Sequence, residues 1–301
     1  MRVVSSMLVY PVRSSLQLLG FALVVLWGPF AYAHADAATS AGAVAETWPA
    51  AALLLAGLCY ARGLFRLLRS ARAHRTRVIR CGVMFALGWM ALNVAFALPL
   101  IGAMRGVFSA HMVQHILLVL IVPALLLLSL PRSFSLPRPL IAFTHPFIGW
   151  IAGVGAMWLW HAPALCNAAT TSRAVSAIQT TSLLLMGSVF WWQVLAPRDA
   201  ERLSPAAGIV YLFTACTACS LLGIILTFAP VSICSVYQHP ADRLGILGTI
   251  RNDWGLTSDK DQQIGGLLMW VPMCLIYLTA ILAQLARWHS DPVPQTEESN
   301  A

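Results

Sequence analysis

The chain is dominated by long apolar runs that alternate with short polar or basic stretches. Seven of these runs each approach the roughly 20 residues that an α-helix needs to cross a hydrocarbon core of about 30 Å. They occupy residues 44–65, 78–101, 107–130, 146–161, 175–196, 206–231 and 264–286. The first is weakened by arginines near its C-terminal end and the fourth by its shortness. The pattern predicts an all-α fold, a polytopic membrane helix bundle with seven transmembrane helices.

The N-terminal segment has a separate pattern. Arg2 and Arg13 precede an apolar stretch at 16–27, and small residues follow at 31–35. This order is typical of a cleaved signal peptide, and an uncleaved extra span is the alternative. We therefore expect a signal peptide or N-terminal anchor at 1–35, a seven-span membrane domain at 36–289 and a disordered cytoplasmic tail at 290–301.

Composition excludes several function classes. The chain is 59% hydrophobic and 10% charged, whereas soluble domains are about 45–50% apolar and about 25% charged. The net charge of +8 does not indicate nucleic-acid binding, because seven basic residues fall in the single stretch 62–80 between two apolar runs. No Asp or Glu lies between Glu46 and Asp199, which argues against a carboxylate proton relay. The absence of a nucleophile–base set, phosphate loop or dinucleotide fingerprint predicts a protein that is not an enzyme.

Basic residues in alternate connections predict the orientation. One set of connections holds twelve of them and the other holds five, and the richer set is expected in the cytoplasm. The protein should therefore have its N-terminus on the outer, periplasmic side after cleavage and its C-terminus in the cytoplasm. The second, fourth and sixth connections then face the periplasm, where we expect a polar cavity to open.

Three histidines gather at the periplasmic ends of the predicted spans. His111 and His115 are four residues apart and share one helix face, and His161 ends the fourth span on the same side. The seventh span begins on that side with Asp261 and places Met269 further along. An imidazole in a bilayer is costly unless it has a partner, so these residues require a common explanation.

Imidazole together with a thioether is the ligand chemistry of copper. The three histidines, with Met157, Met269 and Met273 as candidate thioethers, therefore predict a copper site, in which Asp261 either binds the metal or orients a ring. The alternatives are histidines that hydrogen-bond between helices and methionines that only pack.

The cysteines leave alternatives open. Cys166 and Cys234 fall at periplasmic helix ends, where an oxidising compartment permits a disulfide. Cys216 and Cys219 lie mid-membrane, three residues apart on one helix face. They are either a redox or copper relay or small residues at a helix contact. Cys274 follows no pattern.

Three motifs together resemble the CtaG-type cytochrome c oxidase assembly factor family, over roughly residues 48–288. They are His111-Met112-Val113-Gln114-His115, then Trp160-His161-Ala162-Pro163, then Asp261-Gln262-Gln263-Ile264-Gly265-Gly266 with Met269-Trp270. The resemblance implies a seven-span inner-membrane protein that helps to mature a haem–copper oxidase, most plausibly by handling copper. It carries over to His111, His115, His161, Asp261 and Met269. The implied partners are oxidase subunits and the lipid bilayer, with a periplasmic copper chaperone as a candidate and no nucleic acid.

Two rival functions remain open from the sequence. A b-type membrane cytochrome would use His115 and His161 as axial haem ligands. A copper transporter would continue its ligands through the bilayer, for example through Cys216 and Cys219.

Overall fold

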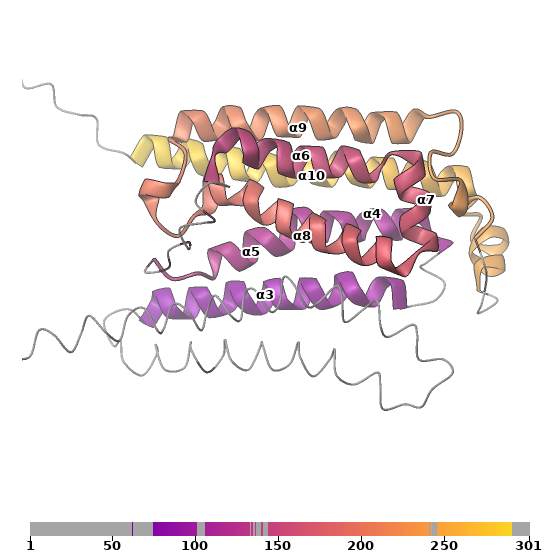
Figure 1. Ribbon diagram of the computed structural model, residues 1–301, viewed down its shortest axis with the longest axis horizontal. Helices are drawn as coiled ribbons and strands as arrows, with labels where there is room; N and C mark the ends of the chain where they lie inside the picture. The colour runs from indigo at the N-terminus through magenta and orange to yellow at the C-terminus, as the bar shows by residue number, and fades with distance from the viewer. Residues whose placement is uncertain are drawn as a thin grey trace, which may run out of the picture.

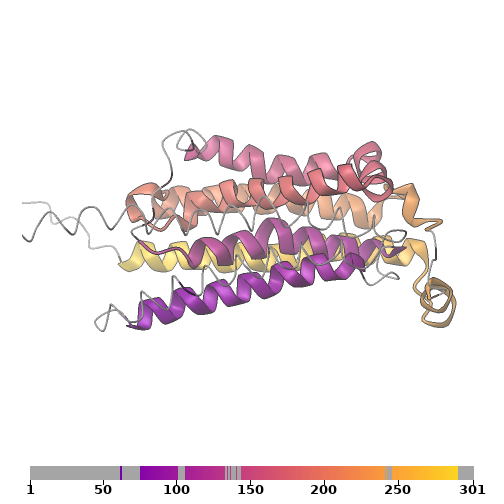
Figure 2. The ribbon, with the colours of Figure 1, turned by 60° about the horizontal axis from the view of Figure 1, so that its bottom comes forward.

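The computed structural model describes residues 62, 75–100, 106–132, 134, 136, 140, 144–240, 242 and 246–290, and within them it contains helices and no strand. Along the chain these are α3 (Arg75–Leu100), α4 (Phe108–Ile116), η4 (Leu117–Ile121), α5 (Val122–Leu128), α6 (Pro146–Trp160), α7 (Pro163–Thr171), α8 (Arg173–Leu195), η6 (Asp199–Glu201), α9 (Pro205–Phe228), η7 (Ser235–Tyr237), η8 (Thr249–Asp253) and α10 (Ser258–Ser290). The long helices run along one common axis, with α3 at one edge of the described helices (Figures 1 and 2). We call the end where α6 finishes and α10 begins the outer end, and the end that holds η6 the inner end.

Five of the predicted spans have helices that are long and apolar enough to cross a membrane. These stretches are Thr76–Phe96, Phe108–Leu128, Ala174–Leu195, Pro205–Phe228 and Ser258–Ser290. The protein is therefore an all-helical, multi-pass membrane protein. The predicted span at 44–65, the N-terminal segment 1–35 and nearly all of the tail lie outside the described residues, so the count of seven and these regions stay predictions.

The fourth predicted span is shorter than the others. Helix α6 has 15 residues, which at about 1.5 Å per residue is about 22 Å. It begins with Pro146 directly after its N-cap His145, and the chain turns at His161 and Ala162 before Pro163 starts α7. Proline is favoured in the first turn of a helix and unfavourable further inside, so the two prolines delimit α6.

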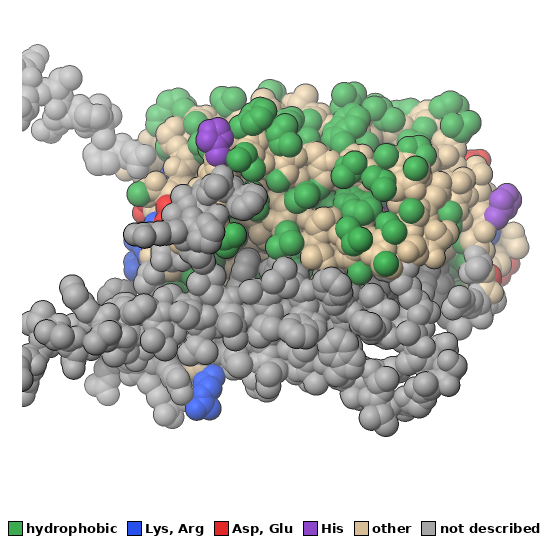
Figure 3. All heavy atoms as spheres, in the orientation of Figure 1, with side chains coloured by type: hydrophobic (Ala, Val, Ile, Leu, Met, Phe, Trp, Pro, Cys, Tyr) green, Lys and Arg blue, Asp and Glu red, His purple; other side chains and the backbone are tan. Residues whose placement is uncertain are grey.

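Lipid-facing surfaces are covered by apolar side chains. Figure 3 shows hydrophobic side chains along the length of the bundle and charged side chains at its two ends. Phe228 and Phe147 are 72% and 67% exposed, values that suit contact with hydrocarbon rather than water. Ion pairs between Arg198 and Glu201 and between Arg202 and Asp199 gather at the inner end.

Small residues bring α9 and α10 into close contact. A Cβ added to Gly223 would lie 2.8 Å from the Cβ of Trp270, and one added to Gly266 would lie 2.5 Å from the backbone nitrogen of Thr227. Such close approach is how helices pack in lipid, where apolar burial drives association only weakly. It sets the register of α10, and therefore the level of Asp261 and Met269, against the rest of the bundle.

The third span contains a π-helical turn, η4, between the histidines and the inner half. Pro123 lacks an N–H, so it cannot hydrogen-bond the carbonyl of Val119 four residues earlier. A Cβ on Gly187 of α8 would collide with that carbonyl oxygen, which places the α8 backbone directly against the irregular turn. Helix α4 is thereby joined to α5 through a local break, a feature that often occurs at functional sites.

The orientation predicted from the basic residues is testable with reporter fusions. A phosphatase that is active only in the periplasm should be active when fused after Ser258, and inactive when fused after Arg198. Enzyme activity in intact cells, normalised to the amount of fusion protein, is the measurement. The reverse pattern would place the outer end of the bundle in the cytoplasm.

Candidate metal centre

Three imidazoles form a continuous row at the outer end. The ring centroids of His111 and His115 on α4 are 4.3 Å apart, and those of His115 and His161 are 5.1 Å apart. His115 and His161 are buried and His111 is half-buried. These contacts confirm that His111 and His115 share a face of α4. The third histidine of the row, His161, comes from the C-terminal end of α6.

Several ring nitrogens in this row have no hydrogen-bond partner among the described residues. They are Nε2 of His111 and both nitrogens of His115. The side chain of Gln179 on α8 interacts with His115 and that of Gln114 interacts with His111, but neither contact has the geometry of a well-formed hydrogen bond, and Nε2 of Gln179 has no other partner. A buried polar atom left unpaired costs about 1–3 kcal/mol. These ring nitrogens are therefore the polar atoms at the outer end with the fewest protein partners among the described residues.

His161 is oriented by its own helix. Its Nδ1 lies 2.6 Å from the carbonyl oxygen of Met157 and its Nε2 lies 3.3 Å from the thioether sulfur of Met112. Because a carbonyl only accepts, Nδ1 carries the proton and Nε2 of the neutral ring keeps its lone pair. This is the arrangement in which an imidazole binds a metal through the free nitrogen.

Met112 was not among the predicted site residues. It is fully buried, and its sulfur faces His161 across the gap between α4 and α6. Its side chain also packs near Gly265 of α10, where an added Cβ would lie 3.1 Å from Met112 Cγ. The one feature of the sequence that could have indicated Met112 as a site residue is its position inside the His111–His115 motif. Helical periodicity, however, places Met112 on a different face from the two histidines.

Asp261 lies at the N-terminus of α4 rather than among the rings. One carboxylate oxygen accepts hydrogen bonds from the N–H of Ser109 at 2.9 Å and its hydroxyl at 2.7 Å. The other accepts from the N–H of Phe108 at 2.8 Å and from the guanidinium of Arg251 at 3.3 Å. The N-cap residue Val107 has no side chain able to cap, so Asp261 supplies the cap from α10. Both oxygens accept hydrogen bonds, so Asp261 positions the start of α4, and its predicted role as a metal ligand or ring-orienting group stays a prediction.

Arg251 ties the outer loop to the same carboxylate. Its guanidinium donates to the carbonyl oxygens of Leu256 at 2.9 Å, Gly106 at 3.0 Å and Tyr237 at 3.4 Å. The Arg251 side chain is 16% exposed and that of Asp261 is 1% exposed. Removing one partner of such a buried pair leaves the other charge uncompensated, which typically costs about 3–5 kcal/mol.

Tyr237, in the outer loop, covers His111, the first histidine of the row. Its ring centroid lies 5.8 Å from that of His111 and 5.4 Å from that of Phe108, and the side chain is buried. Burial, reinforced by the charge of Asp261, raises the pKa of Tyr237 above its ordinary value, so the cover is a neutral phenol.

A disulfide holds this cover in place. Cys234, directly before η7, is bonded to Cys166 of α7 with a Cα–Cα distance of 5.9 Å, the pairing that their predicted positions permitted. The side chain of Asn167 adds to it by accepting a hydrogen bond from the N–H of Val236 at 3.1 Å. The segment that carries Tyr237 is thus attached to the helix that follows His161.

Met269 is fully buried on α10, one turn after Gly265, which faces Phe108 and Met112 of α4. Within the part of the chain that the structure describes, no three His, Cys, Asp or Glu side chains already stand in an arrangement that could hold a metal ion. A metal bound at the row would therefore need rotation of the imidazoles and a donor of another type, such as the sulfur of Met112.

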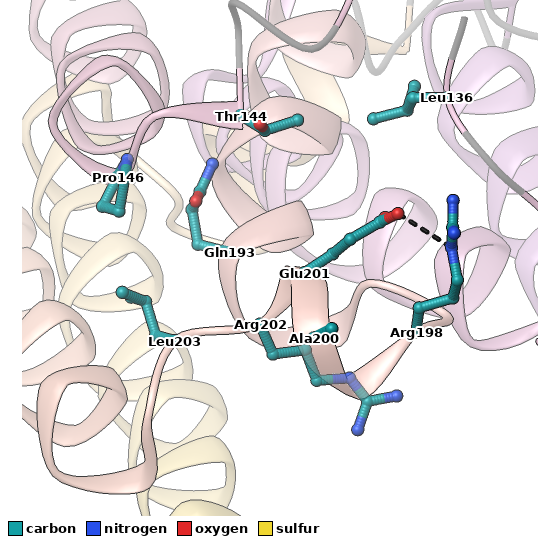
Figure 4. A pocket seen from close by; sticks show the side chains of 9 residues that line it. All are labelled: Leu136, Thr144, Pro146, Gln193, Arg198, Ala200, Glu201, Arg202 and Leu203. Atoms are coloured by element: carbon teal, nitrogen blue, oxygen red, sulfur yellow. Dashed lines mark ion pairs between the residues drawn. The ribbon is translucent and has the colours of Figure 1, made fainter.

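Two hollows lie at opposite ends of the bundle. The outer hollow, of about 450 Å³, is lined by Gln238, His239, Pro240, Asp242, Leu247, Gly248, Arg251, Asn252, Thr257 and Ser258. This agrees with the expected cavity at that end, but none of the three histidines is among its lining residues. The inner hollow, of about 340 Å³, is bordered by Gln193, by the Arg198–Glu201 ion pair and by Arg202 (Figure 4).

The capping role of Asp261 predicts a clear stability effect. Asp261→Asn should lower the free energy of unfolding by about 3 kcal/mol, because it removes the charge opposite buried Arg251 and weakens the cap of α4. Thermal unfolding in detergent is the measurement. The matched control is Asp259→Asn, an exposed carboxylate in the same helical turn, which should change stability by less than about 0.5 kcal/mol. Equal effects of the two substitutions would contradict this role.

The disulfide predicts a pattern of thiol labelling. In intact cells, Cys166 and Cys234 should resist alkylation until a reductant is added, and Cys234→Ser should make Cys166 reactive. Mass spectrometry of the labelled peptides is the measurement, with Cys81 as the free thiol for comparison. Ready labelling of both residues in untreated cells would rule out the bridge.

Comparison with known proteins agrees with these features. A protein-family model described as cytochrome c oxidase caa3 assembly factor matches residues 58–291. An uncharacterised protein of Mycobacterium leprae (strain TN) is 23% identical over 244 residues, covering 70% of this chain. The chain covers 36% of the length of that relative. No solved structure matches. Because the family model spans most of the chain, including all three motifs, this protein belongs to the cytochrome c oxidase caa3 assembly factor family.

Proposed function

We propose that the protein assists assembly of a haem–copper cytochrome c oxidase by holding copper at the outer end of the bundle, through His111, His115, His161 and Met112. The observation that carries this proposal is the row of three imidazoles, in which Nε2 of His111 and both nitrogens of His115 make no well-formed hydrogen bond, beside a thioether sulfur 3.3 Å from His161 Nε2. Copper here is cargo for the oxidase, and the protein acts without catalysing a reaction.

The donor set favours copper on chemical grounds. Imidazole suits several metals, but thioether sulfur is a soft ligand that favours Cu(I), and no carboxylate takes part in the row. His161 contributes a ring whose free nitrogen is set by the carbonyl of Met157. Met269 is fully buried on α10, one turn after Gly265, which faces Met112 of α4. Its sulfur is a further candidate donor.

Copper exchange would require the cover to move. Tyr237 lies over His111, and the cover is held by Arg251 and by the Cys166–Cys234 disulfide. On the orientation predicted from basic residues, this cover faces the periplasm of a bacterial inner membrane. The partners of the exchange are then oxidase subunits as recipients and a periplasmic copper chaperone as donor.

The geometry of the row disfavours the haem-binding alternative. Two axial ligands must lie on opposite sides of a porphyrin plane. The rings of His115 and His161 are in direct edge-to-face contact, with centroids 5.1 Å apart, which leaves no space for a macrocycle between them. A metal ion smaller than a haem is therefore the better ligand for this pair.

Copper binding by variants tests the proposal. His111→Ala, His115→Ala and His161→Ala should each weaken Cu(I) binding by more than the roughly 10–100-fold that loss of a group outside the ligand set costs. Met112→Leu removes the sulfur with little change in volume and should also weaken Cu(I) binding. His145→Ala is the control, because His145 caps α6 at the inner end of the bundle. Competition against a Cu(I) chelator in detergent is the measurement.

Cells that carry the histidine variants give a second measurement. Oxidase subunits and haem should be present while the enzyme is poor in copper and low in activity, with partial rescue by added copper. Normal Cu(I) binding by all three variants, or loss of haem with copper intact, would overturn copper handling and favour a scaffolding role.

A further inference from the structure

Two cysteines from different helices meet at the middle of the bundle. The sulfur of Cys216 on α9 lies 3.5 Å from the sulfur of Cys274 on α10. Cys216 is 11 residues after Pro205 and 12 before Phe228, so the pair sits near mid-membrane. The close packing of α9 on α10 brings the two thiols together, although they are 58 residues apart in the chain.

The hydrogen bonds around this pair define where each proton lies. Ser220 donates its hydroxyl hydrogen to the carbonyl of Cys216 at 2.7 Å, and its oxygen lies 3.1 Å from the sulfur of Cys274. With the serine proton used there, the arrangement that pairs both thiols has Cys274 donating to Ser220 and Cys216 donating to Cys274, while the Cys216 sulfur also lies 4.0 Å from the Ser220 oxygen. One proton therefore lies between the two sulfurs.

We propose that Cys216 and Cys274 form a second soft-metal site, which binds one Cu(I) ion in place of that proton. This inference rests on the proposed function only for the identity of the metal. The step is an exchange: Cu(I) forms one bond to each sulfur, the S–H bond of Cys216 breaks, and one proton leaves. Cys274 keeps its own proton, which continues to hydrogen-bond to Ser220. The total charge within the membrane is unchanged, and no oxidant or reductant is needed.

The site requires only a small opening. If Cu(I)–sulfur bonds are close to the about 2.3 Å of zinc–thiolate bonds, a linear S–Cu–S unit places the sulfurs about 4.6 Å apart. The two sulfurs must then separate by about 1 Å from their present 3.5 Å. Both cysteines are half-buried, so rotation of their side chains is less restricted than in the core.

Buried methionines occupy the part of α10 between this pair and the outer end. Met269 lies one turn beyond Gly265, Met273 follows one turn later, and Cys274 is the next residue. Both methionines are fully buried. Soft sulfur donors therefore recur along α10 from the level of Met112 to the thiol pair. A Cu(I) site at the thiol pair would use the same kind of soft ligand as the proposed copper site at the histidines.

Counting bound Cu(I) tests the second site separately from the first. Purified protein in detergent is titrated anaerobically with Cu(I) against a coloured Cu(I) chelator. The wild type should bind two equivalents, Cys216→Ser/Cys274→Ser one, the His111→Ala/His115→Ala/His161→Ala variant one, and the combined variant none. The histidine variant should also release one proton per Cu(I) and develop the ultraviolet thiolate-to-Cu(I) absorption.

Two matched cysteine controls keep the result specific. Cys219→Ser removes a thiol one turn along α9 that lies 3.8 Å from the hydroxyl of Tyr277, and Cys81→Ser removes one on α3. Both should retain two equivalents. Should the double variant fail to fold, protection from alkylation replaces it. Cu(I) should then slow labelling of Cys216 and Cys274, but not of Cys81, by a small membrane-permeant maleimide in the wild type.

The outcomes separate the two proposals. If the cysteine variant binds two equivalents, or if Cu(I) leaves the labelling of Cys216 and Cys274 unchanged, the thiols only pack and this inference is overturned. If the histidine variant keeps two equivalents while the cysteine variant loses one, the outer copper site fails and the thiol site stands.

Discussion

The carboxylate of Asp261 is the contact on which the outer end of the bundle depends. In lipid, apolar side chains gain little by leaving hydrocarbon for a helix interface, so polar contacts and close packing decide how helices are placed. Helix α4 begins without a capping side chain of its own, and its first N–H groups would otherwise be unpaired in an apolar medium. Asp261 satisfies two of them from α10 and shares its charge with Arg251, which in turn binds three loop carbonyls. One buried anion thereby fixes two helices and the outer loop together.

The position of the histidines follows from that cap. With the start of α4 held at Phe108, His111 and His115 fall about one and two turns below it on one face, with His111 in contact with Tyr237. The opposite wall comes from α6, which ends where Pro163 begins a new helix and leaves His161 at the corner with Nδ1 tied to Met157. The unpaired nitrogens of His111 and His115 are therefore held in place by groups that do not touch them. A site arranged in this way stays ordered without a ligand, since its order is supplied by the cap, the loop and the disulfide.

The sequence predicted what depends on local periodicity and missed what depends on contacts between distant segments. Apolar runs located the helices, and the spacing of four residues placed His111 and His115 on one face, because both rules need only neighbouring positions. The role of Asp261 was not predicted, since the N–H groups that it binds are about 150 residues away. Met112 was missed because helical geometry turns it away from His111, towards a histidine on another helix. Cys274 followed no pattern for the same reason, as its partner is 58 residues earlier on α9.

The distribution of charge along the bundle indicates which cation the interior suits. No Asp or Glu occurs in residues 47–198, 206–231 or 264–286, so the predicted spans from 78 onward offer no carboxylate to a metal. A divalent ion bound there by neutral donors would bring two uncompensated charges into a medium of low dielectric constant. A monovalent soft ion that replaces a thiol proton adds no charge, and one held by imidazoles and a thioether near the outer end adds only one. On the two proposals, the deeper site is thus the one that adds no charge, at the depth where a bilayer makes an added charge most costly.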